Sequence, residues 1–486
     1  MREISADQVK KIIKQFNPHW KSGAIENEIR KFKKRRYFDL FFPLVTTKVK
    51  RAVVLMGPRR VGKTVLLWQT LQELLKKKNI KKKLLFLSLD APLLSSFSLE
   101  ELLDLYREIF SLKTLKGRVV IFDEIQYLKN WDIQLKVLVD NHPQTKFIAS
   151  GSAAGALKRK GQESGAGRFT DFLLPPLTFF EYLELLGLSG SFFKFPKTGF
   201  SKTRKVKLKA KRIEGLNREF INYINYGGFP EAIFNKEIQK DPQRFIRSDI
   251  VDKVLLRDLP SLYGIRDTQE LNRLFATLVY QTGNEISLEG LSRSSGVDKN
   301  TLKKYIEYLE AAFLIKTVKR VDFSSKRFKR ENFFKVYLSN PSMYSAIYGS
   351  VPKEDTETLG SLVETAVFCQ YPQPLYGNRV FYARGKGGKE EVDFVFLNER
   401  LKVFDALEVK WSDSHVYDPR KLKALVDFCH RNKLERGVTT TKRNLGIREI
   451  DNKTIAFIPA AYYCFLIGGF CIVGMVSMPK DLYLLD

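Results

Sequence analysis

The sequence predicts an α/β protein in three stretches: a parallel sheet around a phosphate-binding loop, a helical middle that ends in a winged helix, and a second α/β domain at the C-terminus. Two observations predict the first stretch. Short apolar runs at 52–56, 83–89, 118–122 and 145–149 alternate with helical segments, which is typical of a doubly wound parallel sheet. A G-x-x-x-x-G-K-T loop also separates the first run from a helix. Residues 1–50 precede these motifs as a predicted helical lead-in.

The phosphate-binding loop occupies residues 57–64. Its glycines allow backbone N–H groups to close around phosphate oxygens, and the N-terminus of the next helix adds the positive end of its dipole. Lys63 supplies a point charge, and Thr64 offers a hydroxyl to Mg²⁺. The predicted contacts to ATP or GTP are Gly57, Pro58, Arg59, Arg60, Val61, Gly62, Lys63 and Thr64.

Two carboxylates follow the apolar run at 118–122. Asp123 suits the shell of a metal ion, and Glu124 suits orienting or deprotonating a water molecule. Ser150 ends the next run and is placed to sense the γ-phosphate or the attacking water, with a small polar turn residue as the alternative. The carboxyl ends of parallel strands lie on one edge of a sheet, so these motifs are expected to meet there. The sequence therefore predicts Mg²⁺-dependent hydrolysis of ATP or GTP.

Composition limits the partners. The chain has 83 Lys and Arg residues against 54 Asp and Glu residues, a formal charge of +29. This excess favours nucleic acid first and an anionic membrane second, with a solvated lysine-rich surface as the alternative. The four cysteines show no metal-type spacing and the N-terminus has no apolar signal segment, so we expect a cytoplasmic protein.

The segment 454–479 contains no charged residue and is long enough for a membrane span. However, Pro459, Gly468, Gly469 and Gly474 interrupt it, and its first half alternates like a strand. We therefore predict buried strands of a terminal domain here, and we do not expect a membrane partner.

Residues 268–340 show the pattern of a winged helix. A short helix after Ile286, a turn at 294–297 and a second helix capped by Asp298 precede two β-prone segments. Such a helix enters the DNA major groove while the wing lies on phosphates; contact with proteins is the alternative. Two basic stretches also favour DNA. They are the segment 201–212, in which seven residues are Lys or Arg, and the wing tip with Lys326, Arg327, Lys329 and Arg330.

The C-terminal stretch carries a second candidate active site. Asp393 lies on a predicted strand, and Glu408 and Lys410 share one face of the next strand, because side chains alternate along a strand. Glu364, on a predicted helix, offers a third carboxylate. Carboxylates bind Mg²⁺ or Mn²⁺, and a lysine can activate water or stabilise charge on phosphorus. We predict Glu364, Asp393 and Glu408 as metal ligands and Asp393, Glu408 and Lys410 as catalytic residues. A nuclease-like fold that has lost cleavage is the alternative.

The order of these motifs resembles the archaeal and bacterial P-loop ATPases of the AAA+ type that carry a C-terminal domain related to restriction endonucleases. The residues that carry the resemblance are 57–64, 122–126, 150–152, 167–168, 176–182, 227–231, 362–364, 382, 384, 391–394 and 408–410. The resemblance implies that Lys63 and Thr64 bind phosphate and Mg²⁺, that Asp123 holds Mg²⁺ and that Glu124 is the catalytic carboxylate. It also implies that Arg168 contacts the γ-phosphate, in cis or from a neighbouring subunit of a homo-oligomer.

Four parts follow: a lead-in and P-loop ATPase domain at 1–185, a basic insertion and lid-like helical region at 186–267, a winged helix at 268–340 and a restriction-endonuclease-like domain at 341–486. The expected function is ATP hydrolysis with DNA binding, coupled to DNA remodelling or cleavage. The alternative is an ATP-switched regulatory or scaffold protein with an inactive docking domain. ATP and Mg²⁺ are the expected cofactors, with a second Mg²⁺ or Mn²⁺ in the C-terminal domain. Asn340 departs from the resemblance, because such proteins often carry aspartate there.

Overall fold

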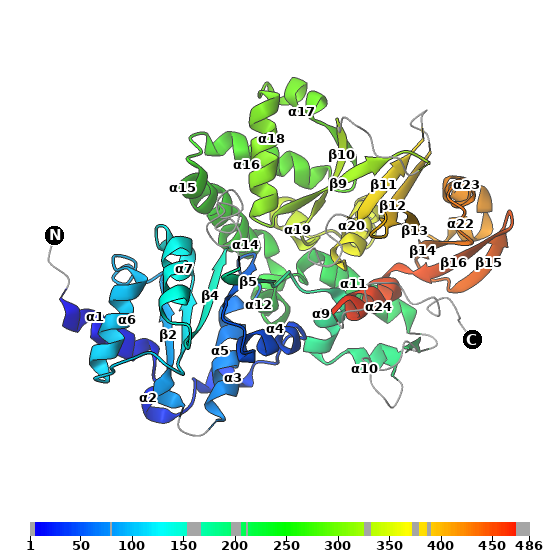
Figure 1. The fold of residues 1–486 in the computed structure, drawn as a ribbon. Helices are drawn as coiled ribbons and strands as arrows, with labels where there is room; N and C mark the ends of the chain where they lie inside the picture. The colour runs from blue at the N-terminus through cyan, green and yellow to red at the C-terminus, as the bar shows by residue number, and fades with distance from the viewer. Residues whose placement is uncertain are drawn as a thin grey trace. The chain divides into compact units, whose positions relative to one another are not determined.

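The chain forms two compact units, one ending at Pro175 and the other beginning at Pro176. The computed structural model describes residues 5–77, 80–152, 167–195, 206–209, 212–324, 332–371, 379–385 and 390–472 (Figure 1). The first unit ends before the boundary expected at residue 185, so helix α9 (Phe179–Leu186) belongs to the second unit. The three further parts expected from the sequence all lie within that second unit.

The first unit is built on a five-stranded sheet in which every neighbouring pair of strands is parallel. The order across the sheet is β2 (Leu84–Ser88), β3 (Val119–Asp123), β4 (Lys146–Ser152), β1 (Ala52–Gly57) and β5 (Phe169–Leu173). The predicted parallel α/β sheet is confirmed. Its strands read as continuous apolar runs because both faces of a parallel sheet are covered.

Helices cover both faces of this sheet (Figure 1). They are α1 (Ala6–Phe16), α2 (His19–Ser22), α3 (Asn27–Lys31), α4 (Tyr37–Thr46), α5 (Lys63–Leu75), α6 (Leu99–Ile109) and α7 (Trp131–Asn141), with 3₁₀ turns η1 (Lys81–Lys83) and η2 (Ile125–Tyr127). On one face, Leu87 and Phe122 of the sheet share a core with Ile13 of α1. On the other face, Trp68 of α5 stacks on Phe86 with ring centroids 4.1 Å apart. Consecutive residues of a strand thus pack against the helices on opposite faces of the sheet.

The second unit contains a nine-stranded mixed sheet. Its order is β15 (Gly446–Ile450), β16 (Lys453–Pro459), β14 (Arg436–Thr441), β13 (Val403–Glu408), β12 (Glu391–Leu397), β11 (Val380–Arg384), β9 (Ile315–Val321), β10 (Phe333–Leu338) and β8 (Glu285–Ser287). Strand β12 runs antiparallel to β11 and β13, whereas β14 runs parallel to β13 and β16. A two-stranded hairpin pairs β6 (Phe193–Lys194) with β7 (Lys207–Leu208).

Helices surround this sheet and fill the segment before it. After α9 they are α10 (Ser189–Phe192), α11 (Ile213–Tyr226), α12 (Pro230–Phe234), α13 (Lys236–Lys240), α14 (Pro242–Ile246), α15 (Leu259–Tyr263), α16 (Thr268–Tyr280), α17 (Leu288–Ser295), α18 (Lys299–Ala311), α19 (Ser342–Tyr348), α20 (Thr356–Cys369), α22 (Ser414–Tyr417), α23 (Lys423–Arg431) and α24 (Ala460–Ile472). Two π-helical stretches, η4 (Arg247–Asp252) and η5 (Val254–Asp258), join α14 to α15, and the 3₁₀ turn η6 (Pro419–Leu422) precedes α23.

The helix pair expected from the sequence is present as α17 and α18. Asp298 caps α18 by accepting the N–H groups of Asn300 at 2.9 Å and Thr301 at 3.2 Å. The two strands that follow, β9 and β10, form an antiparallel hairpin. This hairpin is not a free wing, because the other edge of β9 pairs in parallel with β11. The expected winged helix and the expected nuclease-like domain therefore share one sheet, and no boundary separates them at residue 340.

The uncharged segment begins as the strand β16 but continues as the helix α24, in which every residue is buried. The prediction of strands for its second half is wrong over residues 460–472. A helix that is buried on all sides has no apolar periodicity, so its sequence cannot be distinguished from that of buried strands. Gly468 allows close packing, since a Cβ there would lie 2.8 Å from Oε1 of Gln370. Within the described part of the chain, no helix has the length and apolarity needed to cross a membrane.

Candidate functional site

The phosphate-binding loop connects β1 to α5 at the carboxyl edge of the parallel sheet. Gly57 ends β1 where the chain after β5 passes closely, and a Cβ there would lie 2.3 Å from the carbonyl oxygen of Leu174. Gly62 precedes α5 with φ at +93°, in the left-handed region that favours glycine. Both glycines of the motif are therefore required by the backbone itself. Helix α5 begins at Lys63, so its free N–H groups lie next to the loop.

Asp123 is the centre of a hydrogen-bonded group beside this loop, which we call the corner and which consists of Lys63, Thr64, Asp123, Glu124 and Ser150. Its Oδ2 accepts the Thr64 hydroxyl at 2.8 Å, and its Oδ1 accepts the Ser150 hydroxyl. The Asp123 side chain is buried, and this burial raises its pKa to about 6, although the Ser150 hydrogen bond opposes the rise. The parallel register of β1, β3 and β4 therefore brings together three residues that lie far apart in the sequence.

The Lys63 ammonium is buried and donates to the loop's own carbonyl oxygens, Gly57 O at 3.1 Å and Pro58 O at 2.9 Å. A lysine side chain has rotatable donors and can exchange carbonyl oxygens for phosphate oxygens. Its position under the loop agrees with the role predicted from the motif.

Glu124 begins the η2 turn in the left-handed conformation, with φ at +53°. Its backbone N–H donates to the Ser150 hydroxyl at 3.2 Å, and its carboxylate accepts the side-chain amide of Gln126. A non-glycine residue at this φ is uncommon and is often found at functional sites. Gln126 is a partner to which the sequence analysis gave no role. The D-E-x-Q spacing is the signal that identifies it.

Arg35 was also missed by the sequence analysis. Its buried guanidinium donates to Val61 O at 2.9 Å and to Pro175 O at 2.8 Å, so the lead-in fixes the phosphate loop from outside the motif. Arg35 lies in a run of basic residues, 30–36, that looks like any solvated charged stretch. No sequence signal distinguishes it from its neighbours.

Arg168 does not lie beside the phosphate loop of its own chain. Its backbone carbonyl accepts the N–H of Ala52, the first residue of β1, whereas the loop follows the last residue of that strand. Its guanidinium pairs with Asp140 at 3.0 Å. The length of β1 separates Arg168 from the loop, so the predicted γ-phosphate contact in cis does not agree with this placement. Contact across subunits stays a prediction.

These residues fit a magnesium–nucleotide complex. Thr64 and Asp123 offer hard oxygen ligands 2.8 Å apart, close to the separation of about 3 Å between adjacent ligands around an octahedral Mg²⁺. Lys63 and the N-terminus of α5 add positive charge for the phosphates. The donor set and its spacing are thus those required by the predicted cofactors.

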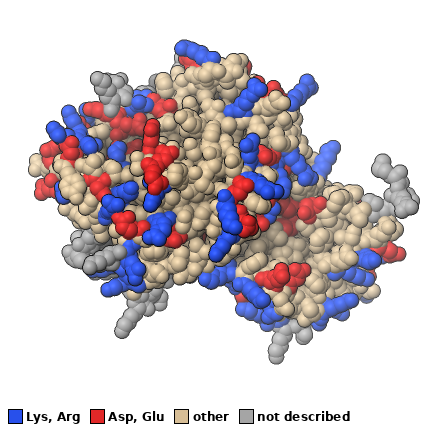
Figure 2. Space-filling view, turned by 180° about the vertical axis from the view of Figure 1, so that it is seen from behind, with Lys and Arg blue, Asp and Glu red and all other residues tan. Residues whose placement is uncertain are grey.

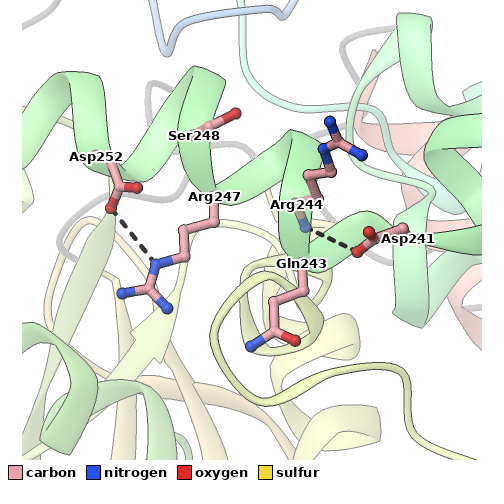
Figure 3. Close-up of a pocket in the computed structure, with 6 residues that line it drawn as sticks. All are labelled: Asp241, Gln243, Arg244, Arg247, Ser248 and Asp252. Atoms are coloured by element: carbon pink, nitrogen blue, oxygen red, sulfur yellow. Dashed lines mark hydrogen bonds and ion pairs between the residues drawn. The ribbon is translucent and has the colours of Figure 1, made fainter.

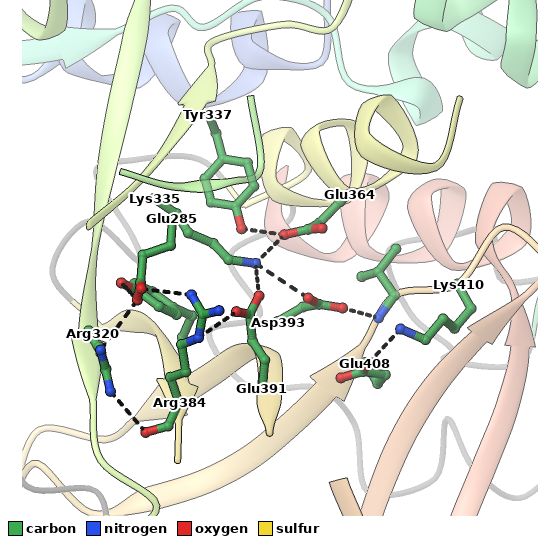
Figure 4. A network of polar contacts seen from close by, with 12 residues as sticks. Glu285, Arg320, Lys335, Tyr337, Glu364, Arg384, Glu391, Asp393, Glu408 and Lys410 are labelled. Carbon is green, nitrogen blue, oxygen red and sulfur yellow. Dashed lines mark hydrogen bonds and ion pairs between the residues drawn. The ribbon is translucent and has the colours of Figure 1, made fainter. Parts of the chain in front are cut away.

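The second candidate site lies where β10, β12, β13 and α20 meet (Figure 4). The structure brings the predicted residues Glu364, Asp393, Glu408 and Lys410 into one network there. Its centre, however, is Lys335 of β10, to which the sequence analysis gave no role.

The Lys335 side chain is 2% exposed and contacts three carboxylates. Its ammonium lies 2.9 Å from Glu364, 2.6 Å from Glu391 and 3.4 Å from Asp393. Tyr337, two residues along β10, donates its hydroxyl to Glu364 at 2.6 Å. Although burial alone lowers the pKa of Lys335, its carboxylate neighbours raise the pKa well above its usual value.

Lys410 and Glu408 form the other end of this network. The Lys410 ammonium lies 2.6 Å from Oε1 of Glu408. Oε2 of Glu408 is buried and has no hydrogen-bond partner among the described residues. Asp393 is oriented toward this end, because its Oδ2 accepts the N–H of Val409 at 2.8 Å. Burial, followed by the charge of Asp393, raises the pKa of Glu408 to about 8.

The predicted second metal site is not formed. Among the described residues, no group of three or more His, Cys, Asp or Glu side chains is arranged to hold a metal ion. Instead, the Lys335 ammonium contacts oxygens of both Glu364 and Asp393. Two of the three predicted carboxylates, Glu364 and Asp393, contact Lys335, whereas Glu408 pairs with Lys410.

A further layer of ion pairs supports this network from β8, β9 and β11 (Figure 4). Glu285 accepts hydrogen bonds from Tyr382 at 2.7 Å and from Arg384 at 2.6 Å. Arg384 also lies 3.6 Å from Glu391, which joins this layer to Lys335. The strands of the helix–turn–helix segment and those of the C-terminal segment are therefore joined by partly buried charges as well as by backbone pairing.

A surface pocket of about 330 Å³ lies elsewhere, over α14 and η4 (Figure 3). It is lined by Asp241, Gln243, Arg244, Arg247, Ser248 and Asp252. Arg247 pairs with Asp252 at 3.6 Å. The pocket contains none of the residues predicted from the motifs.

The basic residues are spread over the surface. Figure 2 shows Lys and Arg interspersed with Asp and Glu on the face that it presents. Helix α18 exposes three lysines, Lys299, Lys303 and Lys304. The wing tip, and the segment 201–212 except for residues 206–209 and 212, lie outside the described residues.

Comparison with known proteins agrees with the geometry of the first site. Residues 49–183 match the family described as "AAA domain", and residues 217–354 match a family described as "Domain of unknown function (DUF8612)". The first match contains the phosphate loop, Asp123, Glu124 and Ser150. Over these residues the chain therefore carries an AAA-type P-loop domain, as the sequence analysis predicted.

Similar proteins cover most of the chain. An uncharacterized protein of Methanocaldococcus jannaschii is 24% identical over 83% of this chain and 86% of its own length. An uncharacterized protein of Haemophilus influenzae is 24% identical over 73% of this chain and 82% of its own length. Among solved structures, the Aeropyrum pernix ORC1 protein in complex with DNA is 11% identical over 69% of this chain and 91% of that chain, with a TM-score of 0.30.

Proposed function

We propose that the protein hydrolyses ATP in a Mg²⁺-dependent reaction at the β1–α5 loop. The observation that carries the proposal is the 2.8 Å contact between the Thr64 hydroxyl and the Asp123 carboxylate. This contact places a hydroxyl and a carboxylate together beside a loop whose backbone is shaped to surround phosphates. The choice of ATP over GTP rests on the resemblance to AAA+ ATPases and on the match to the AAA family.

Each residue of the corner has a separate task. Lys63 exchanges the carbonyls of Gly57 and Pro58 for phosphate oxygens, and Thr64 and Asp123 hold the metal. Glu124, oriented by Gln126 and by its backbone bond to Ser150, directs the attacking water. Bound Mg²⁺ supplies charge that the transferring phosphoryl group requires.

Phosphate release by the full chain tests this proposal directly. We expect release from ATP with Mg²⁺, none with EDTA, and a loss of turnover in Glu124→Gln. Equal release by Glu124→Gln and the parent protein would remove Glu124 from its role. Absence of nucleotide binding by the parent protein would remove the whole proposal.

DNA is the proposed partner. The formal charge of +29 and the three exposed lysines of α18 support this proposal, because a helix of a helix–turn–helix pair presents such side chains to phosphates and base edges. We propose that ATP turnover at the first site controls how the second unit holds DNA. A homo-oligomer belongs to this proposal, in which Arg168 contacts the γ-phosphate bound by a neighbouring subunit.

The rival function is an ATP-switched scaffold whose second unit contacts proteins. The burial of Lys335 among three carboxylates favours this rival for the C-terminal part, because the expected metal site is not formed. DNA affinity at low salt distinguishes the two: the scaffold predicts none, and the DNA-binding ATPase predicts binding that weakens steeply with salt.

A further inference from the structure

Three carboxylates of the second unit, those of Glu364, Glu391 and Asp393, surround the buried ammonium group of Lys335. The Lys335 ammonium has three N–H donors, and three carboxylates lie within 3.4 Å of it. Its side chain is 2% exposed, so water does not compete for these donors. Lysine is almost never this buried unless it is paired.

A divalent metal would require the same oxygens. Mg²⁺ and Mn²⁺ bind two or more carboxylates closely, and Glu364 and Asp393 already share the Lys335 ammonium. Two cations among the same buried carboxylates would repel each other strongly, because low polarity strengthens the interaction. The ammonium and the metal therefore exclude each other.

One oxygen of the cluster is left over. Oε2 of the buried Glu408 has no hydrogen-bond partner among the described residues, although Oε1 contacts Lys410. A buried carboxylate oxygen without a partner is costly, and it is the kind of ligand that a metal ion satisfies. The cluster thus combines three carboxylates that share the Lys335 ammonium with a fourth, Glu408, one oxygen of which has no partner.

We propose that Lys335 acts as a tethered cation that replaces the divalent metal of this cluster, so that the parent protein binds no metal there and the cluster does not cleave DNA. Removal of the ammonium leaves the three carboxylates that it contacts, Glu364, Glu391 and Asp393, to bind a divalent cation. Because Lys335 belongs to β10 and these carboxylates belong to α20 and β12, the lysine also joins the helix–turn–helix segment to the C-terminal strands. The proposal does not depend on the ATPase activity.

The test uses the nucleotide-free full chain and Mn²⁺ as the probe, followed by calorimetry. We expect no Mn²⁺ binding that depends on Asp393 in the parent protein. Lys335→Met, which keeps the length of the side chain without its charge, is expected to bind one additional Mn²⁺. Adding Asp393→Asn to Lys335→Met should abolish that site. Lys353→Met, at an exposed position between α19 and α20, is the matched control and should behave as the parent.

Two outcomes overturn the proposal. One is a Mn²⁺ site in the parent protein that disappears in Asp393→Asn. The other is a Lys335→Met protein that folds, as shown by circular dichroism, and gains no site. If Lys335→Met does not fold, the parent titration decides alone, together with incubation of duplex, single-stranded and branched DNA with Mn²⁺. Cleavage that Asp393→Ala and Lys410→Ala both lose contradicts the proposal, and the absence of cleavage supports it.

Discussion

The side chain of Asn17 pairs with both backbone groups of Phe86, donating to its carbonyl at 2.8 Å and accepting its N–H at 2.7 Å. Phe86 lies on β2, the edge strand of the parallel sheet. Trp20 adds a bond from its indole N–H to Leu84 O at 2.7 Å. Edge strands expose unpaired backbone groups that invite association with other chains. Here side chains of the lead-in, rather than a sixth strand, form hydrogen bonds with some of the backbone groups on that edge.

Asn17→Ala should therefore destabilise the first unit by about 2–4 kcal/mol. The change removes three buried hydrogen bonds and leaves the N–H and C=O of Phe86 unpaired. Denaturant unfolding of the full chain, followed by a probe that reports on the first unit, measures the loss. Asn141→Ala, at an exposed position after the core of α7, is the control and should change stability by less than about 0.5 kcal/mol. Equal stability of the two variants would contradict a role for Asn17 at this edge.

Lys63→Ala and Glu124→Gln should separate nucleotide binding from turnover. Lys63→Ala removes the charge under the phosphate loop and should weaken ATP binding. Glu124→Gln preserves the shape of the side chain but removes its charge, so it should bind ATP and lose about 100-fold or more in turnover. Fluorescent-nucleotide binding and phosphate release measure the two effects. Glu28→Gln, an exposed change in the same unit, is the control. A Glu124→Gln protein that fails to bind ATP would mean that Glu124 supports the loop rather than the reaction.

Asp123→Asn should stabilise the nucleotide-free protein above about pH 6. Burial raises the pKa of Asp123 from 3.8 to about 6 in the folded protein. Between these values the folded state holds a proton that the unfolded state releases, so this group's contribution to stability falls as the pH rises and is constant above about 6. An asparagine does not titrate, so the advantage of the variant should grow over this window to about 2–3 kcal/mol.

Melting temperatures of the parent and Asp123→Asn at pH 4, 5, 6 and 7 measure this advantage. Asp39→Asn, at an exposed position, is the control for the loss of one negative charge. A difference that does not vary with pH would show that Asp123 is not the titrating group. The same variant should lose Mg²⁺-dependent turnover, because it lacks the carboxylate ligand.

Charge reversal on α18 should weaken DNA binding. We expect Lys299→Glu, Lys303→Glu and Lys304→Glu together to reduce affinity for duplex DNA and to flatten its salt dependence by about one unit of slope for each lost phosphate contact. Fluorescence anisotropy over about 50–200 mM salt measures both quantities. The control carries the same change in net charge at the exposed Lys236, Lys240 and Lys353. Equal losses in both triple variants would indicate a diffuse charge effect rather than a helix in the groove.

The sequence alone predicted which residues meet beside the β1–α5 loop. The phosphate loop and the Asp123–Glu124 pair are local patterns: a strand of β-branched and apolar residues brings each to the same edge of a parallel sheet, whatever surrounds it. Residues outside the motifs that contact this loop in the folded chain could not be predicted from local patterns. Arg35 contacts Val61 across 26 positions and lies in a basic run without distinguishing features.

In the C-terminal cluster, local sequence patterns predicted some of the residues that meet but not Lys335 at its centre. The acidic motif placed Glu364, Asp393 and Glu408 on the correct helix and strands, because alternation and helical spacing determine which side chains share a face. Lys410, predicted on the same strand as Glu408, lies two residues beyond the end of β13. The same reasoning assigned β10 to a wing, where a lysine within an apolar strand is an ordinary exposed residue. Among the described strands, the pairing of β9 with β11 joins the two segments in one sheet.

That pairing decides the chemistry of the site. It brings Lys335 to Asp393 across 58 positions and converts a predicted metal site into an ion-paired cluster. The sequence by itself determined which residues carry charge and which face of an element they occupy, since both follow from residue type and backbone period. The tertiary structure decided which charges meet, because long-range strand pairing depends on the packing of the whole unit rather than on any local run of residues.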